Sequence, residues 1–363
     1  MIKKECFTAE WIEQVSSELH YNDKNLIEKV IRALSLLEML VKAGCPLVFK
    51  GGTALMLILG KSAHRLSIDI DVICPPGTNI EDYLKSFADF GFINLELVER
   101  KQRDDADIPK SHSKFFYQIA YRNDTDAQSY ILLDVLYEDI HYFRTQQIAI
   151  NCPFIRLEGK PLMVTVPSAE DILGDKLTAF APNTTGIPYY KNGRSCSMEI
   201  AKQLYDVGRL FENVSDLQIT KEAFRKIAVV ELSYRSFGTD IGQVFNDIRQ
   251  TALCISTRGK AGEGDFDLIQ DGIIRVKSFM YKQRYLIDHA IIDAARAAYL
   301  ATLIEKGINE IESYSNNPAD IKDMVIRPSL PNKLNKLRSN LPEAYYYWAK
   351  TSELLEVDRK SVV

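Results

Sequence analysis

The chain has few of the residues that build disulfide frameworks or histidine-rich metal centres. Its six cysteines stand at positions 6, 45, 74, 152, 196 and 254, and no two of them have C-x-x-C spacing. This scatter argues against a structural zinc site and against a disulfide framework. The five histidines are isolated from one another, which argues against a metal centre built on histidine.

Long apolar runs and repeats are also missing. No window offers 18 or more uncharged apolar residues, so the sequence predicts no membrane helix and no membrane partner. The N-terminal stretch Met1–Cys6 is not followed by the apolar segment of a signal peptide. Hydrophobic residues make up 46% of the chain and charged residues 26%, as in ordinary globular proteins. These features together indicate a cytosolic (cytoplasmic) protein.

The order of helical and extended patterns predicts an α/β (α+β) fold in two parts. At 363 residues the chain is long enough for two domains. Helices and strands alternate up to about residue 167, which predicts an N-terminal mixed sheet flanked by helices. Helical patterns then continue almost to the end and predict a C-terminal helical bundle. We place the domain boundary between residues 1–185 and residues 186–363.

Several of these elements have definite expected limits. A helix is expected over 54–59 with Thr53 as its N-cap, and another over Ile80–Phe90 that Gly91 closes. The aromatic Tyr345–Trp348 segment near the C-terminus is expected to be packed. Further strands are expected over 95–99, 115–122 and 130–137, and further helices over 239–255 and 266–283.

The charge of the chain is small but uneven. The net charge is −4, which argues against wholesale electrostatic capture of nucleic acid. Residues 1–185 hold 20 Lys and Arg against 26 Asp and Glu, whereas residues 186–363 hold 25 against 23. A local basic patch in the second part, for example around Lys191 and Arg194, would therefore allow a polynucleotide acceptor without demanding one.

A glycine turn followed by two spaced aspartates is the most informative motif. Residues 49–53 read Phe-Lys-Gly-Gly-Thr, and residues 65–72 read Arg-Leu-Ser-Ile-Asp-Ile-Asp-Val. On a strand Asp69 and Asp71 point to the same face, and a cation between them would relieve their repulsion. Oxygen ligands of this kind suit Mg²⁺ or Mn²⁺ together with substrate phosphates, which the glycine turn could approach through its N–H groups. The alternatives are a solvated strand face and a simple tight turn.

Asp134 is a third carboxylate in an unusual place. It stands in the apolar run Tyr130–Tyr137, where an unpaired charge is costly to bury. We expect it to meet a cation or a hydrogen-bond donor. An exposed position on an edge strand is the alternative reading.

These residues resemble the DNA polymerase β-type nucleotidyltransferase superfamily. More narrowly, the segments at 49–55 and 65–71 resemble the AbiEii/AbiGii toxin family of type IV toxin–antitoxin systems. The sixteen residues between Gly52 and Asp69 fit this branch. The resemblance implies that residues 1–185 form a nucleotidyltransferase catalytic domain. It also implies that Asp69, Asp71 and Asp134 bind the metal and catalyse transfer.

The resemblance also implies a nucleotide-binding set. Lys176 interrupts an apolar helical stripe. The family motif around it implies contact with the triphosphate. The alternative is a surface lysine whose ammonium group reaches out to solvent. Lys202 and Asp206 resemble the family's closing motif, although Gln203 stands where Asp is more usual, and a surface salt bridge is the competing account. The full expected nucleotide-binding set is Lys50, Gly51, Gly52, Thr53, Arg65, Ser67, Lys176, Lys202 and Asp206.

The function expected from the resemblance is a bacterial toxin that moves NMP from an NTP to an acceptor hydroxyl. The cofactor would be Mg²⁺ or Mn²⁺ and the substrate an NTP. The acceptor would be RNA, with the 3′ end of tRNA as the first candidate, and a separate antitoxin would be a partner. Nucleotidylation of a protein or small molecule, and a non-catalytic nucleotide-binding or partner-binding module, remain alternatives. The base of the NTP stays open.

Overall fold

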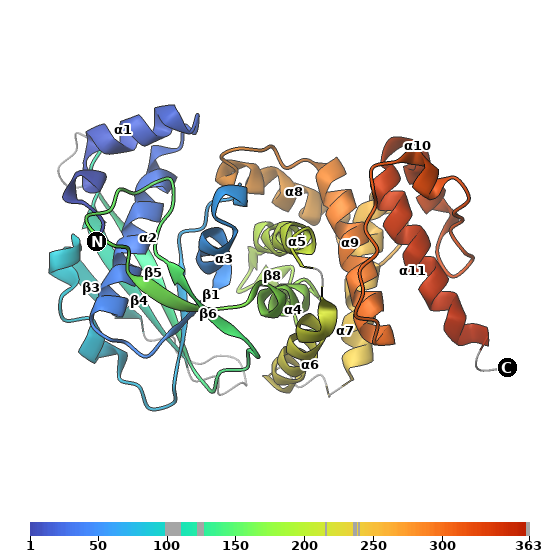
Figure 1. Ribbon diagram of the computed structural model, residues 1–363, viewed down its shortest axis with the longest axis horizontal. Helices are drawn as coiled ribbons and strands as arrows, with labels where there is room; N and C mark the ends of the chain where they lie inside the picture. The colour runs from blue at the N-terminus through green and yellow to red at the C-terminus, as the bar shows by residue number, and fades with distance from the viewer. Residues whose placement is uncertain (99–109, 122–126, 215, 235–237, 239, 361–363) are drawn as a thin grey trace. The chain divides into compact units, whose positions relative to one another are not determined.

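A computed structural model describes residues 1–98, 110–121, 127–214, 216–234, 238 and 240–360 (Figure 1). Contacts divide the chain into two compact units, Met1–Ser168 with Ser278–Arg284, and Ala169–Lys277 with Tyr285–Val363. The first unit holds a mixed sheet with helices and the second is largely helical, which confirms the expected α/β fold with a helical part after the sheet. Domain limits at residues 1–185 and 186–363 stay a prediction. The division by contacts falls earlier because helix α4 (Ala169–Ala179) packs against the helices that follow it.

A five-stranded sheet forms the centre of the first unit, in the order β1-β2-β5-β4-β3 among the described residues. Strands β2 and β5 are parallel, and the other neighbouring pairs are antiparallel. Strands β6 and β7 form a separate hairpin, and β7 lies next to β1. The bounds are β1 Val48–Lys50, β2 Ile70–Cys74, β3 Asn94–Val98, β4 Lys110–Gln118, β5 Gln128–Tyr137, β6 Thr145–Ala149 and β7 Met163–Pro167.

Strand alternation gives this sheet one apolar face and one polar face. In β5, Ile131, Leu133 and Val135 are buried, and the intervening residues, Asp134 among them, point the other way. Helix α2 (Lys24–Lys42) covers the apolar face, and Figure 1 shows it beside strands β4 and β5. The polar face is therefore left to carry functional side chains.

The other helices of the first unit are short. Helix α1 (Ala9–Glu18) packs against α2, and helix α3 (Gly51–Leu59) follows β1 directly. The single helix expected over 80–90 is wrong: the structure has 3₁₀ turns at Ile80–Tyr83 and Phe87–Phe90 instead. Tertiary contacts decide this segment, since Ser35 Oγ donates to the Phe90 carbonyl. Two more 3₁₀ turns span Lys4–Phe7 and Gly60–Ser62.

A late segment of the chain belongs to the first unit. The helix expected over 266–283 ends at Val276, and a 3₁₀ turn covers Lys277–Phe279. The chain then runs beside residues 64–66: Leu66 N donates to Phe279 O at 2.8 Å, and Tyr281 N donates to His64 O at 3.0 Å. This backbone pairing competes with the helix and fixes the segment that precedes Asp69.

The second unit is a bundle around helix α9. Helix α9 (Ile287–Lys306) has an alanine-rich buried surface and contacts α5, α7 and α11. Tyr345, Tyr347 and Trp348 are almost completely buried, so the expected packing of the aromatic tail is confirmed. The remaining elements are α5 Ser197–Phe211, α6 Leu217–Tyr234, α7 Ile241–Ser256, α8 Phe266–Val276, α10 Leu337–Asn340, α11 Pro342–Lys360, 3₁₀ turns Pro318–Ile321 and Asn332–Lys336, and a hairpin of β8 Tyr190–Lys191 with β9 Arg194–Ser195.

The expected ends at Glu99, Arg122 and Thr239 lie outside the described residues. Within the described part of the chain, no helix combines the length and the apolar character that crossing a membrane requires.

Candidate active site

Two of the expected carboxylates are register partners in the sheet. Asp71 of β2 and Asp134 of β5 lie opposite each other on adjacent parallel strands. Neighbouring strands are separated by about 4.8 Å, so both side chains leave the same face at short range. Asp71 is partly buried, and the Asp134 side chain is 38% exposed. The pair can therefore reach a ligand placed on the polar face.

Asp69 stands just before β2 and is exposed. Its backbone carbonyl accepts a hydrogen bond from Thr53 Oγ1 at 2.7 Å. This bond ties the segment ahead of β2 to the first turn of α3. The expectation that Thr53 caps the helix is wrong, because α3 already begins at Gly51 and Lys50 is its N-cap residue. The Thr53 hydroxyl instead donates to the backbone of the segment that carries Asp69.

The glycine turn fits closely against the carboxylates. Gly51 has a φ of +78°, and a Cβ at this position would collide with the Asp71 carboxylate. Only glycine meets both conditions without strain. Lys50 is the register partner of Asp71 on β1, so the start of α3 lies beside the acidic strand. The first N–H groups of a helix have no intrahelical acceptor and attract anions, which makes this turn suitable for phosphate.

Arg65 and Ser67 also converge on this turn. A Cβ on Gly52 would lie 2.7 Å from Ser67 Oγ and 2.9 Å from Arg65 Nη2. Arg65 is only 7% exposed, and its Nη1 donates to the Leu66 carbonyl at 3.0 Å. The structure thus brings both residues to Gly52, and their contact with a substrate stays a prediction.

Sequence reasoning missed His112. This residue lies on β4 opposite Asp134, and its Nδ1 is hydrogen-bonded to Asp134 Oδ1. The expected strand began at Phe115, so His112 fell outside it, whereas β4 begins at Lys110. Alternation back from the buried Phe115 would have placed His112 on the polar face, had the strand been extended.

The second unit holds the remaining expected residues. Lys176 of α4 lies 3.1 Å from Asp206 Oδ2 on α5 and donates to Gln203 Oε1 at 3.0 Å. Lys176 is 7% exposed and Asp206 is 1% exposed. A lysine reaching out to solvent is therefore excluded. Lys202 is partly buried on α5. These residues form a group in the second unit, whereas the carboxylates and the glycine turn form a group in the first.

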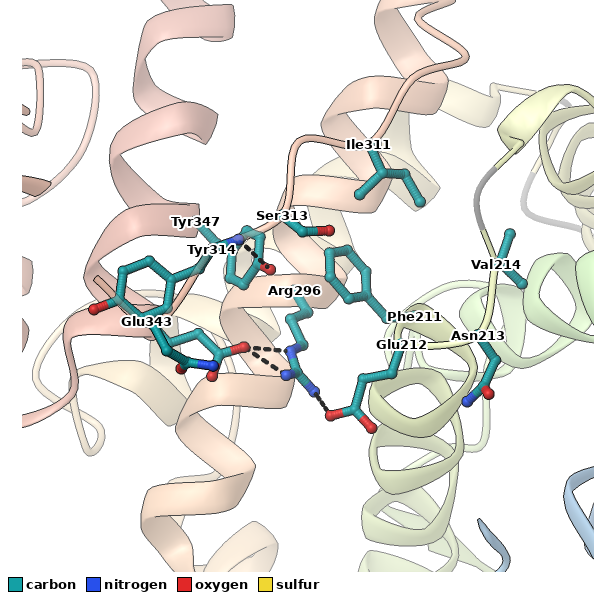
Figure 2. A pocket seen from close by; sticks show the side chains of 11 residues that line it. Phe211, Glu212, Asn213, Val214, Arg296, Ile311, Ser313, Tyr314, Glu343 and Tyr347 are labelled. Carbon is teal, nitrogen blue, oxygen red and sulfur yellow. Dashed lines mark hydrogen bonds and ion pairs between the residues drawn. The ribbon is translucent and has the colours of Figure 1, made fainter. Parts of the chain in front are cut away.

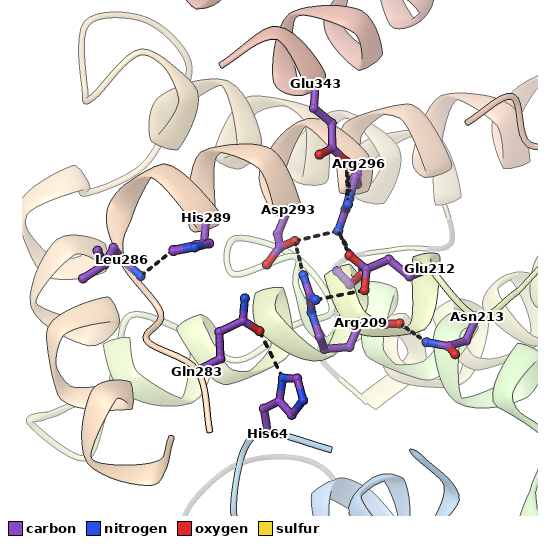
Figure 3. A network of polar contacts seen from close by, with 11 residues as sticks. His64, Arg209, Glu212, Asn213, Gln283, Leu286, His289, Asp293, Arg296 and Glu343 are labelled. Carbon is purple, nitrogen blue, oxygen red and sulfur yellow. Dashed lines mark hydrogen bonds and ion pairs between the residues drawn. The ribbon is translucent and has the colours of Figure 1, made fainter. Parts of the chain in front are cut away.

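The second unit also holds a buried charge network (Figure 3). Asp293 of α9 lies 3.5 Å from Arg209 and 3.3 Å from Arg296, and Arg296 also pairs with Glu212 at 2.9 Å and with Glu343. Burial raises the pKa of Asp293 to about 6, although both guanidinium groups act in the opposite direction. A Cβ on residue 208 would collide with this carboxylate, so glycine is required there.

A cavity of about 550 Å³ adjoins this network (Figure 2). Arg296, Glu212 and Glu343 line it together with the rings of Phe211 and Tyr347. Since Arg296 binds both of these carboxylates, the charged lining is already paired within the protein. The network joins α5, α9 and α11 and fits a structural role.

The first unit offers oxygen ligands for a divalent cation. The described residues contain no group of three or more His, Cys, Asp and Glu side chains placed to hold a metal. Mg²⁺, however, is commonly bound by one or two carboxylates plus substrate phosphates and water. The register pair Asp71 and Asp134 beside the glycine turn fits that mode. A third carboxylate ligand from Asp69 stays a prediction.

Comparison with known families decides the class. The sequence model of the AbiEii nucleotidyl transferase toxin family, of type IV toxin–antitoxin systems, matches residues 34–319. The chain belongs to the AbiEii family. Both the glycine turn with its carboxylates and the Lys176–Asp206 pair fall within the matched residues. No curated protein matches the sequence.

Solved structures similar to this AbiEii chain include two of low sequence identity. JHP933 from Helicobacter pylori is 16% identical, covers 85% of this chain and 95% of its own, and has a TM-score of 0.38. MenT4, a nucleotidyltransferase toxin from Mycobacterium tuberculosis, is 14% identical, covers 81% of this chain and 89% of its own, and has a TM-score of 0.40.

Proposed function

We propose that this AbiEii-family chain transfers NMP from an NTP to an acceptor hydroxyl with the help of Mg²⁺ or Mn²⁺. The observation that carries the proposal is the register pairing of Asp71 with Asp134 directly beside Gly51. A helix N-terminus for phosphate and two carboxylates for a cation then share one sheet face. This combination suits phosphoryl-group chemistry better than any other reaction that these side chains could support.

The residues of the first unit would position the triphosphate. The N–H groups of Gly52 and Thr53 at the start of α3 would bind phosphate oxygens, and Arg65 and Ser67 would add donors at Gly52. Asp69, Asp71 and Asp134 would hold the cation. The cation would neutralise charge on the phosphates as the bond to the leaving group breaks.

Asp134 would also act on the acceptor. Its side chain is 38% exposed and so can meet an incoming hydroxyl. The hydroxyl oxygen forms a bond to the α-phosphorus while its proton passes to Asp134. The bond from the α-phosphorus to the bridging oxygen then breaks, and pyrophosphate leaves.

Lys176 would contact the triphosphate, which is the role that the family motif around it implies. An ammonium group has three N–H donors, and Gln203 and Asp206 account for two of them. The third donor would bind a phosphate oxygen. Gln203, which departs from the family pattern, still supplies an acceptor oxygen to Lys176. Asp206 would keep the lysine aligned, and Lys202 would add a positive charge on α5, the helix of Asp206.

RNA is the acceptor that we propose, with the tRNA 3′ end as the first candidate. The β8–β9 hairpin carries Lys191 and Arg194 as register partners, and both side chains are exposed. Exposed cations of this kind can bind backbone phosphates. Family membership also supports a separate antitoxin as partner. A protein or small-molecule acceptor is the second candidate.

Labelling of total RNA tests the proposal directly. The purified protein would be incubated with Mg²⁺, total RNA and each of the four NTPs in turn, labelled at the α-phosphate. We expect label to enter the tRNA fraction from at least one NTP, and to stay out when a chelator is present. Label that enters protein or a small molecule would show that the acceptor is that molecule and not RNA. A lack of transfer to any acceptor would contradict the proposed activity.

A further inference from the structure

The inference concerns His112, which the expected site did not include. His112 and Asp134 are register partners on the antiparallel strands β4 and β5, so their side chains leave the same face of the sheet. Nδ1 of the histidine is bonded to Oδ1 of the aspartate. The imidazole is 10% exposed and the carboxylate 38%. The ring is therefore the fixed partner and the carboxylate the accessible one.

The hydrogen bond sets the direction of donation. An ionised carboxylate only accepts, so the hydrogen must stand on Nδ1 of His112. Nε2 is buried and has no hydrogen-bond partner within the described residues. A buried lone pair without a partner is tolerated more readily than a buried N–H without one, which favours the same tautomer. Within the described residues, the only hydrogen bond of the ring is therefore the one to Asp134 Oδ1.

We propose that His112 is a positioning residue for Asp134, and this rests on the proposed function of that carboxylate. With Oδ1 held by the ring, the carboxylate cannot rotate freely about its Cβ–Cγ bond. Oδ2 is then the oxygen left to meet the cation and the acceptor hydroxyl. Hydrogen bonds to metal-binding carboxylates are a recurrent device, and their loss costs about 10–100-fold in metal affinity or activity.

Two substitutions separate positioning from packing. His112→Asn keeps a donor at the place of Nδ1 and loses the rest of the ring, whereas His112→Phe keeps an aromatic ring and loses the donor. We expect His112→Phe to lower kcat about 10–100-fold with an almost unchanged KM for NTP, and His112→Asn to retain most of the wild-type rate. Lys114→Ala is the matched control, since Lys114 is two residues along the same strand face and pairs with Glu96.

A higher kcat in His112→Phe than in His112→Asn would overturn the inference. A merely structural ring would be replaced well by Phe and poorly by Asn, and melting temperature would then follow activity. Wild-type kcat in His112→Phe, or equal losses in both variants matched by equal losses of melting temperature, would also overturn it. Long-range ¹H–¹⁵N NMR should show hydrogen on Nδ1, and a ring with hydrogen on Nε2 alone would contradict the proposed bond.

Mn²⁺ binding measured by electron paramagnetic resonance distinguishes this inference from the proposed function. We expect His112→Phe to weaken Mn²⁺ binding about tenfold and His112→Asn to preserve it, whether or not NMP transfer is detected. If the wild type shows no NMP transfer but the two variants still differ in Mn²⁺ affinity as expected, the proposed function is contradicted and the positioning role stands. Unchanged Mn²⁺ affinity in His112→Phe would overturn the positioning role alone.

Discussion

Lys176 Nζ lies 3.1 Å from Asp206 Oδ2, and both side chains are buried between helices α4 and α5. Removing one member of a buried ion pair costs about 3–5 kcal/mol. We therefore predict that Lys176→Met and Asp206→Leu each lower the free energy of unfolding by that order. Denaturant unfolding followed by circular dichroism measures the effect, and an unchanged midpoint for either variant would contradict the buried pairing.

The double variant Lys176→Met/Asp206→Leu separates stability from function. Replacing both charges with apolar groups removes the penalty, so most of the lost stability should return. NMP transfer should remain far below wild type, because the third donor of Lys176 is gone. A double variant with wild-type transfer would show that this pair only holds the two helices together.

Gly51 offers a test of the glycine turn. Gly51→Ala places a methyl group against the Asp71 carboxylate and should displace it, and misplacement by about 1 Å can cost about 100-fold in rate. Gly44→Ala is the matched control, since Gly44 also has a positive φ, of 75°, and a Cβ there meets nothing within 4 Å. The control should lose about 1–2 kcal/mol of stability and keep its activity. Equal activity in both variants would refute the steric argument.

Asp293 gives a prediction for pH. Burial raises its pKa in the folded protein from the ordinary 3.8 to about 6, so the folded state binds more protons than the unfolded state between these values. Its contribution to stability is present in full below pH 3.8 and is lost as the pH rises through 6. A difference of roughly two pKa units corresponds to about 3 kcal/mol.

Asp293→Asn isolates that contribution. The free energy of unfolding of the wild type, minus that of the variant, should fall between about pH 4 and pH 6 and level off above. Urea unfolding at several pH values measures both curves. A difference that is flat over this range, or one that rises with pH, would contradict the raised pKa.

Lys191 and Arg194 test the RNA acceptor. Phosphate contacts release counterions, so tRNA affinity should fall steeply with salt, and changing both residues to Glu should weaken binding and flatten that slope. Lys322 and Lys336 are exposed on the same unit, so a variant with both changed to Glu is the matched control. This control should bind tRNA like the wild type. RNA binding indifferent to salt and to Lys191 and Arg194 would favour a protein or small-molecule acceptor.

The elements with strong local patterns could be predicted from the sequence. The apolar run around Asp134 predicts a strand, and β5 confirms it, because local periodicity and tertiary packing agree there. Residues 80–90 and 277–284 could not be predicted, since backbone groups there are bonded to distant parts of the chain.

The candidate site shows the same division. Gly51, Asp69 and Asp71 stand within one short sequence window, and their residue types already suggest phosphate and cation binding. His112 belongs with Asp134 only through the pairing of β4 with β5, which no local pattern reveals. The partnership of Lys176 with Asp206 likewise depends on the packing of α4 against α5. Strand register and helix packing therefore determine which residues become partners in the site, and the sequence motifs do not.

The most direct test of the account is NMP transfer by Asp71→Asn, which removes one negative charge and keeps the side-chain shape. With the NTP and acceptor found for the wild type, and Mg²⁺ present, the account predicts no measurable transfer. The circular dichroism spectrum and melting temperature should match the wild type, so that unfolding is ruled out as the cause. Transfer at the wild-type rate by this folded variant would contradict the assignment of Asp71, and with it the proposed active site.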